Sequence, residues 1–268
     1  MAQLSGKYTI NKGVAASTTN YTSFRSFASA INSKGVSGPV TVDVVAGSGP
    51  YSEQVAFSAS GTATNTITIN GNGEKITSSG SYPNYTVIHL NGADFFTFNN
   101  LTVEANGTSS GTRCYTINRG ANSNTIKNSN LLMPRYTGTS SYTAYVMYSS
   151  DLYYRRGANH GTGNVVKDNV MSNGVSTTAG PYCGVADYRC CTQSDGNIVD
   201  NNIISDVYYA GIYNYYASNF EATNNTINFR SRTSYTCYGI YGYRGAGDKV
   251  KINGNKIENQ NLTTGMYG

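Results

Sequence analysis

Two sets of short segments recur along the chain, and their spacing constrains the fold more than any other feature of the sequence. The first set places an apolar residue before a polar corner rich in Asn, as in FTFNNLTV, VVKDNVM, IVDNNII and VKINGNK. Its equivalent positions are 29, 28, 40, 33, 23 and 30 residues apart and are Asn72, Leu101, Ser129, Asn169, Asn202, Asn225 and Asn255.

The second set runs in phase with the first and includes YTINR, YVMYS, GVADYR, GIYNYY and GIYGYR. Its positions are 28, 30, 39, 27, 28 and 26 residues apart and are Val87, Tyr115, Tyr145, Gly184, Gly211, Gly239 and Gly265. The two sets agree on a period near 28 residues, which holds two or three short alternating strands and Gly- and Asn-rich turns. Because no unit has room for a regular helix, the pattern predicts a solenoid built only of strands.

In such a solenoid each strand lies parallel to its counterpart one unit later, so equivalent residues stack on one another. We expect an inner apolar column of Ile69, Phe98, Ile126, Val166, Val199 and Ile252. Stacked asparagines form hydrogen bonds along the stacking direction, and Asn and Gly tolerate the left-handed backbone of a tight corner. The recurring asparagines are therefore interpreted as structural corner residues without a chemical role.

A different pattern precedes the repeats. A short amphipathic helix is predicted from apolar residues at helical spacing, which are Phe24, Phe27, Ala28 and Ile31. Ser23 precedes this helix and Gly35 follows it as a stop signal. The segment PVTVDVV, residues 39–45, then predicts the first strand. A helix in this place would cover the open first unit and its apolar interior, as the end of a solenoid requires.

These repeats resemble the right-handed parallel β-helix proteins of the pectate-lyase-like superfamily. The opening segments, LSGKYTI, YTSFRSFASAINSKGVSGPVTVDVVAGSGPYSEQV and GTATNTITINGNG, are similar to β-helix domains of secreted Bacteroidetes-type surface proteins. The resemblance implies an all-β, right-handed parallel β-helix of about seven to eight coils with a short N-terminal capping helix. It implies one domain over residues 1–268, with 1–45 as the cap and first strand and 46–268 as the coils, located at the cell surface or outside the cell.

The last four residues, GMYG from Gly265 to Gly268, match GIYG at residues 239–242. We therefore expect the coils to continue in a longer parent protein, or the last coil to be completed by a neighbouring molecule. The second expectation predicts a self-assembling extracellular fibre.

Charge and hydropathy disfavour two kinds of partner. The formal net charge is +5 without a run of Lys and Arg, which argues against nucleic acid. No apolar stretch reaches the roughly 20 residues that a membrane-spanning helix needs, so no membrane span is expected.

The five cysteines show no metal-binding CxxC pattern. Cys114 and Cys183 are expected in the same register two units apart, which is too far for a direct bridge. Cys183 is near enough in sequence to close a short loop with Cys190 or Cys191. Buried free thiols are the equally plausible alternative.

Tyrosines concentrate in the second set of segments. Because neighbours along a strand point to opposite faces, Tyr213 and Tyr215 share one face, and tyrosines one unit later would stack on them. An outward strip of rings suits sugars or another protein; alternatively the rings pack inward or only stack on one another. The expected ligand-binding residues are Tyr153, Tyr154, Arg155, Arg156, Tyr188, Tyr213, Tyr215, Tyr241 and Tyr243.

The two longest units are adjacent and contain charged segments at residues 149–163 and 188–196. Their arginine pair suits an anionic polysaccharide, and a solvated loop is the alternative. A uronate lyase would need a base and charge neutralisation, for which the candidates are Arg156, Asp187 and Arg189, with Asp187 and Asp195 as Ca²⁺ ligands. The chain has only 14 acidic residues and no cluster of them in consecutive units, which disfavours an enzyme.

The sequence therefore favours a structural or adhesive β-helix outside the cell that binds a polysaccharide or a cell-surface partner. A uronate lyase and a self-assembling fibre subunit are the alternatives. No cofactor is expected, except Ca²⁺ for the lyase.

Overall fold

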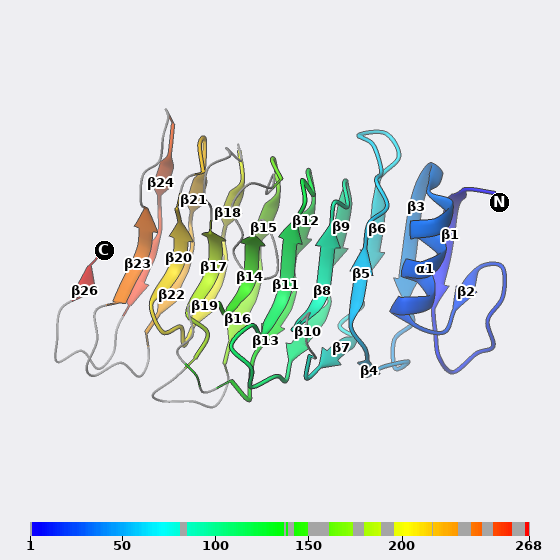
Figure 1. Cartoon of the computed structure of the whole chain (residues 1–268), viewed down its shortest axis with the longest axis horizontal. Helices are drawn as coiled ribbons and strands as arrows, with labels where there is room; N and C mark the ends of the chain where they lie inside the picture. The colour runs from blue at the N-terminus through cyan, green and yellow to red at the C-terminus, as the bar shows by residue number, and fades with distance from the viewer. Residues whose placement is uncertain are drawn as a thin grey trace.

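A computed structural model of the chain describes residues 2–80, 85–136, 138, 142–149, 161–173, 180–188, 196–215, 217–229, 237–242, 249–258 and 266–267. Its strands form three sheets, of ten, eight and eight strands, that run side by side along one axis (Figure 1). Every pairing between neighbouring strands is parallel. The predicted parallel β-helix is therefore confirmed.

Sheet A has the strand order β2-β1-β3-β6-β9-β12-β15-β18-β21-β24. Its strands are β1 (Leu4–Ile10), β2 (Asn20–Tyr21), β3 (Val36–Val44), β6 (Ile67–Asn70), β9 (Phe96–Asn99), β12 (Thr125–Lys127), β15 (Val165–Lys167), β18 (Ile198–Asp200), β21 (Glu221–Thr223) and β24 (Lys251–Asn253). The predicted first strand over residues 39–45 lies within β3, but β1 comes before it in the chain and pairs with it.

Sheet B comprises β4 (Tyr51–Ser52), β7 (Lys75–Ser78), β10 (Thr102–Ala105), β13 (Asn130–Leu132), β16 (Val170–Ser172), β19 (Ile203–Ser205), β22 (Thr226–Asn228) and β25 (Lys256–Glu258). Sheet C comprises β5 (Val55–Phe57), β8 (Thr86–Asn91), β11 (Arg113–Asn118), β14 (Ala144–Ser149), β17 (Cys183–Tyr188), β20 (Ala210–Asn214), β23 (Cys237–Gly242) and β26 (Met266–Tyr267). Each coil thus passes from sheet A to sheet B and then to sheet C.

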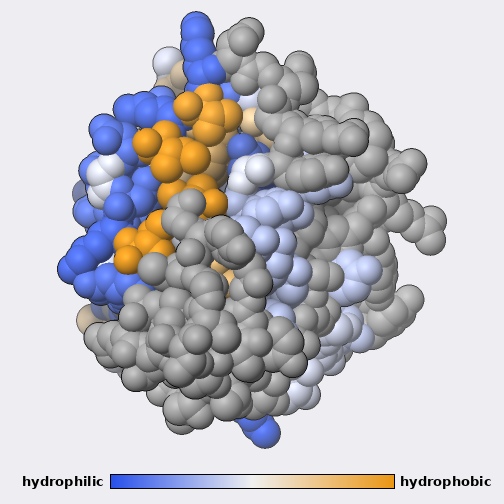
Figure 2. All heavy atoms as spheres, turned by 90° about the vertical axis from the view of Figure 1, so that its left-hand side faces the viewer, coloured by the Kyte–Doolittle hydropathy of each residue, from blue (hydrophilic) through white to orange (hydrophobic). Residues whose placement is uncertain are grey.

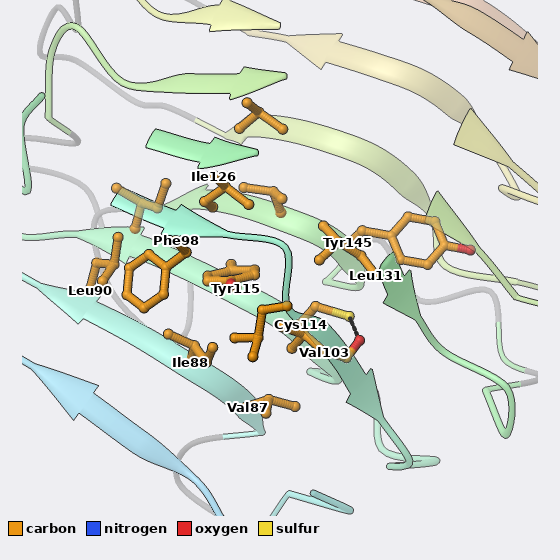
Figure 3. Close-up of a cluster of buried hydrophobic side chains, with 14 of the residues drawn as sticks. Val87, Ile88, Leu90, Phe98, Val103, Cys114, Tyr115, Ile126, Leu131 and Tyr145 are labelled. Atoms are coloured by element: carbon orange, nitrogen blue, oxygen red, sulfur yellow. Dashed lines mark hydrogen bonds between the residues drawn. The ribbon is translucent and has the colours of Figure 1, made fainter. Parts of the chain in front are cut away.

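The inner face of sheet A carries the predicted apolar column. Strand pairing places these residues opposite one another in the order Ile69, Phe98, Ile126, Val166, Val199, Ala222 and Ile252. Figure 3 shows how this column meets residues of the other two sheets in the interior. The expectation for Ile252 is half right: it stands in the column but is 55% exposed, because β24 is the edge strand of sheet A.

The register of sheet C corrects one predicted alignment. Thr86 lies opposite Arg113 and Ile88 opposite Tyr115, so Val87 aligns with Cys114 and not with Tyr115. The thiol of Cys114 points into the core and donates to the carbonyl oxygen of Val103 at 3.5 Å (Figure 3). Cys183 instead aligns with Arg113 through Ala144. The expectation that Cys114 and Cys183 share a register is therefore wrong.

Three glycines of sheet C face inward for a steric reason. Gly184, Gly211 and Gly239 occupy one column, as predicted. A Cβ atom at Gly211 would lie 2.5 Å from Cγ2 of Ile227 in sheet B, and one at Gly184 or Gly239 would overlap Ile204 or Ile257 in the same way. Each of these glycines of sheet C therefore lies beside an isoleucine of sheet B, which fills the space that a larger side chain of sheet C would need.

Strand β26 shows that the expected alignment of the last residues is wrong by three positions. Met266 lies opposite Cys237, and Tyr267 lies opposite Tyr238. This register excludes the predicted match of Gly265 with Gly239.

A buried asparagine ladder follows sheet A at its corner with sheet B. In each coil the backbone N–H of the ladder residue donates to the side-chain oxygen of the ladder residue one coil later, over 2.9–3.1 Å. Each Asn also donates its side-chain N–H to a backbone carbonyl of an earlier coil, as Asn202 does to Val166. The side-chain oxygens come from Ser129, Asn169, Asn202, Asn225 and Asn255, as predicted.

Asn72 and Leu101 do not contribute side chains to this ladder. Leu101 donates only its backbone N–H, to Ser129. Asn72 lies in a longer corner, of four residues between β6 and β7 where the next coil has two. It takes a left-handed backbone, with φ of 51°, and its side chain donates to the carbonyl oxygen of Val44. The predicted ladder position of Asn72 is therefore wrong.

A second buried ladder precedes sheet A, and the sequence analysis missed it. Asn124 donates both its backbone and its side-chain N–H to the side-chain oxygen of Asn164 at 3.0 Å, and Asn164 does the same to Asn197. The backbone N–H of Phe96 donates to Asn124. These asparagines stand five residues before Ser129, Asn169 and Asn202, a spacing that is visible in the sequence. Three strands of sheet A are thus held between two ladders.

The predicted capping helix is confirmed as α1 (Phe24–Lys34). Ser23 and Ser26 form a capping box at its start, and its buried residues are Phe24, Phe27, Ala28 and Ile31. Asn32 accepts from the backbone N–H of Ser58 and Ala59 and donates to the carbonyl of Ala56, so α1 covers the edge of sheet C at β5 (Figure 1). No helix in the described residues is long and apolar enough to cross a membrane.

The ladder should contribute strongly to stability. Asn202→Ala leaves the buried N–H of Asn169 and the carbonyl of Val166 without this partner, so we expect the free energy of unfolding to fall by about 3 kcal/mol or more. Asn99→Ala, on the solvent side of sheet A, should change it by less than about 1 kcal/mol. Urea denaturation measures both, and equal losses would contradict the ladder's role.

The glycine column makes a second prediction. Gly211→Ala should destabilise the protein by about 1–3 kcal/mol, because the new methyl group overlaps Ile227. Ile227→Ala removes both methyl groups that the new Cβ would overlap, so the double variant should be more stable than the sum of the single changes predicts. Strict additivity in a double-mutant cycle would show that the two residues do not compete for the same space.

Candidate functional site

The outer face of sheet C changes its chemistry along the coil axis. One outward row, set by strand pairing, is His89, Thr116, Met147, Ala186, Tyr213 and Tyr241. The neighbouring row is Arg113, Ala144, Cys183, Ala210 and Tyr238. The face is therefore polar in the early coils, small and apolar in the middle, and aromatic in the later coils.

The middle of this face is a second hydrophobic cluster, separate from the main core. Its outward-facing members Ala144, Met147, Cys183, Ala186 and Ala210 are fully buried. Tyr213 belongs to it and is 8% exposed. Half-buried tyrosines pack against it, and together with Tyr213 we call them the tyrosine cluster: Tyr182, Tyr209, Tyr213, Tyr215, Tyr238 and Tyr241.

The rings of the tyrosine cluster stack mainly on one another. The rings of Tyr213 and Tyr241 are stacked and nearly parallel, with centroids 5.0 Å apart and planes at 5°, and Tyr213 also stacks with Tyr215 at 6.0 Å. Tyr182 and Tyr209 stack at 4.6 Å. The expected alternative that the rings stack on one another therefore holds. Neighbouring rings therefore cover the faces of these stacked rings.

The environment raises the pKa of three phenols of the tyrosine cluster. Burial raises the pKa of Tyr182 to about 12, and the nearby Cys183 and neighbouring tyrosines add to the rise. Burial first, and then the same neighbours, raise the pKa values of Tyr209 and Tyr213 further. At neutral pH each hydroxyl therefore remains a hydrogen-bond donor and does not act as a base.

The polar end of the face is a hydrogen-bonded network. Nε2 of His89 lies 2.8 Å from the side-chain oxygen of Asn118, and the hydroxyls of Thr86 and Thr116 are 2.7 Å apart. The guanidinium of Arg113 donates to the carbonyl of Tyr142 at 3.0 Å. Burial lowers the pKa of His89, and the nearby Arg113 and Arg119 lower it further against the hydrogen bond to Asn118. A neutral His89 fits a structural role.

Of the predicted catalytic and metal-binding residues, the structure describes only Asp187. Asp187 is 1% exposed and lies opposite Tyr148 and Asn214, away from the outward rows. The other members of the set, Arg156, Arg189 and Asp195, lie outside the described residues. Within the part of the chain that the structure describes, no group of three or more His, Cys, Asp or Glu residues could hold a metal ion.

Only part of the predicted ligand-binding set can be placed. Tyr213, Tyr215 and Tyr241 belong to the tyrosine cluster. Tyr188 is the last residue of β17, and the structure describes its backbone but not its side chain. The remaining members lie outside the described residues: Tyr153, Tyr154, Arg155, Arg156 and Tyr243.

The sequence analysis missed Tyr182, Tyr209 and Tyr238. Tyr182 and Tyr209 each stand two residues before an inward glycine, and Tyr238 stands directly before one. A recurring Tyr ahead of the glycine column was therefore the available signal. Tyr209 contacts more of the cluster than the predicted residues do, since its ring lies within 6.1 Å of those of Tyr182, Tyr213, Tyr238 and Tyr241.

The raised pKa values predict a loss of stability in alkali. An unfolded tyrosine ionises near pH 10, whereas the folded phenols of Tyr182, Tyr209 and Tyr213 ionise later. Their contribution is fully present below pH 10 and declines as the pH rises through about 10 toward the folded values. Urea midpoints measured across this range should fall less steeply for Tyr209→Phe than for the parent protein. An unchanged slope would contradict the assignment.

No family model matches the sequence, and no curated protein matches it either. Solved structures do match almost the whole chain. The protein ybhc of Escherichia coli has a TM-score of 0.57 at 12% identity, covering 96% of this chain and 73% of its own. Pectate lyase Pel9A has a TM-score of 0.50 at 14% identity, covering 98% of this chain and 80% of its own.

The alginate lyase from Paenibacillus sp. str. FPU-7 is 17% identical, with a TM-score of 0.45, and covers 90% of this chain and 97% of its own. At such low identity, likeness shows the fold alone. The likeness to ybhc and Pel9A and the three parallel sheets together show that the chain has the right-handed parallel β-helix fold.

Proposed function

We propose that this β-helix binds a polysaccharide along the outer face of sheet C and acts at the cell surface or outside the cell as a binding or adhesive protein. The observation that carries the proposal is the tyrosine cluster, which gathers six rings around an outward apolar strip on neighbouring coils. Surface tyrosines combine a large apolar area with a polar tip and are common in recognition surfaces.

The geometry favours an extended, repeating ligand. Parallel strands are about 4.8 Å apart, so equivalent tyrosines such as Tyr213 and Tyr241 repeat at one coil spacing. A polymer whose units repeat along its length can meet both tyrosines of such a pair, whereas a small solute meets one. The ring edges offer apolar contact to C–H groups, and the neutral hydroxyls offer hydrogen bonds to sugar hydroxyls.

The named activity of one structural neighbour points the same way. Pel9A is named a pectate lyase, a protein that acts on a polysaccharide. A lyase reaction for this chain has less support, because Asp187 is buried and lies apart from the outward rows. We therefore propose binding in preference to turnover.

The proposal predicts a particular ranking of tyrosine variants. If ring edges and hydroxyls make the contacts, Tyr209→Phe and Tyr238→Phe should each weaken polysaccharide binding about fivefold, as the loss of one net hydrogen bond implies. Alanine variants should weaken it further. Affinity electrophoresis in gels containing polygalacturonate, alginate or a β-glucan measures the effect.

Tyr8 provides the matched control, since it is a partly buried tyrosine of β1 in sheet A. Tyr8→Phe should leave the retardation unchanged. Binding to none of the three polysaccharides would overturn the proposal, and so would equal retardation of the parent and the cluster variants. Phenylalanine variants that bind normally while alanine variants fail would point instead to stacking on the ring faces.

A further inference from the structure

A hollow of about 370 Å³ lies on the outer face of sheet A, on a different sheet from the tyrosine cluster. Its residues come from β18, β21 and β24, each of which follows a strand of the tyrosine face in the chain. Ile198 supplies apolar surface, and polar groups come from Asp200, Glu221, Thr223, Asn224 and Lys251. The hollow thus combines an apolar wall with both donors and acceptors.

The hollow lies where long side chains give way to short ones along one outward row. Strand pairing gives this row as Asp43, Asn70, Asn99, Lys127, Lys167, Asp200, Thr223 and Asn253. The long lysines of the earlier coils give way to short side chains, while Glu221 and Lys251 stand in the neighbouring row. The depression is therefore a property of the sequence of the later coils.

The polar groups of the hollow are held in fixed orientations. The Oδ1 atom of Asp200 accepts from the hydroxyl of Thr223 and, at 3.0 Å, from the side-chain amide of Asn224. The ammonium group of Lys251 lies 3.2 Å from Oε2 of Glu221, and both side chains remain more than a third exposed. Such groups need little rearrangement to meet a ligand, which favours binding.

In the earlier coils of the same face, the polar side chains are hydrogen-bonded to one another. There Asn128 donates to Asn99, Asn99 to Asn70, and Asn70 to Asp43, over 2.8–3.1 Å. In the hollow the hydrogen bonds to Asp200 all fall on Oδ1, and the ion pair of Glu221 uses Oε2. The second oxygen of each carboxylate is thus the acceptor that a ligand hydroxyl can reach.

We propose that this hollow binds one neutral pyranose residue of a saccharide. Carboxylate oxygens accept from sugar hydroxyls, the Lys251 ammonium and the Asn253 amide donate to them, and Ile198 packs against ring C–H groups. The volume lies within the range of small-molecule sites. Asp200 and Glu221 outnumber Lys251, so a uronate is disfavoured. This site does not depend on the tyrosine cluster.

Amide chemical-shift changes on titration with methyl β-D-glucopyranoside test the proposal. In the ¹⁵N-labelled protein we expect saturable shifts of the backbone and side-chain amides of Asn224 and Asn253. Methyl β-D-glucuronide should give shifts at least threefold smaller at the same concentration. Shifts that are absent, or that are equally large with the glucuronide, would overturn the proposal.

Variants separate the hollow from the tyrosine face. Glu221→Gln and Asp200→Asn preserve side-chain size and should abolish the shifts, while thermal melts report whether each variant is folded. Lys127→Gln alters the same outward row outside the hollow and should change nothing, and Tyr209→Phe should leave the shifts intact. Shifts that disappear with Tyr209→Phe and survive Glu221→Gln would contradict a site on sheet A and leave the proposed tyrosine surface standing.

Discussion

The need to satisfy backbone polar groups at dry corners governs this fold. An unpaired buried N–H or C=O group costs about as much as several net hydrogen bonds contribute, and every coil turns next to sheet A inside the core. The ladder amides meet this need by bonding to both neighbouring coils. Asn202 accepts from Asn169 and donates to Val166 in the preceding coil, and it donates to Asn225 in the next. Because each bond joins equivalent positions, a coil cannot slip by one residue without losing several bonds at once.

This fixed register lets the inside and outside of the solenoid serve separate purposes. Inside, isoleucines of sheet B fill the space beside the glycines of sheet C. Outside, aligned rows pass from polar to apolar to aromatic residues without disturbing the core. The end of the solenoid that faces the viewer in Figure 2 shows an apolar area beside hydrophilic residues. Val250 and Ile252, next to and within the edge strand β24, are exposed.

The parts of the structure that repeat strictly could be predicted from the sequence. The ladder at Asn169, Asn202 and Asn225 and the capping helix followed from spacing and residue type. Asn72 was misplaced because its corner is longer by two residues, which the period alone does not reveal. Val87 was aligned with Tyr115 because both Cys114 and Tyr115 are buried in the core cluster, which breaks simple alternation. The tyrosine cluster was only partly foreseen, since its extent depends on which rings meet across coils.

The side-chain amides of the asparagines form two lines of dipoles along the solenoid axis. In the buried ladder one side-chain N–H of each donating Asn points toward the next coil, as from Asn169 to Asn202. On the solvent side of sheet A the donated N–H points toward the earlier coil, as from Asn201 to Asp168. Side-chain amides carry dipoles that contribute to the local field. Two antiparallel lines of dipoles a few residues apart largely cancel along the axis. A rod built in this way can lengthen coil by coil without accumulating a macrodipole from its asparagines.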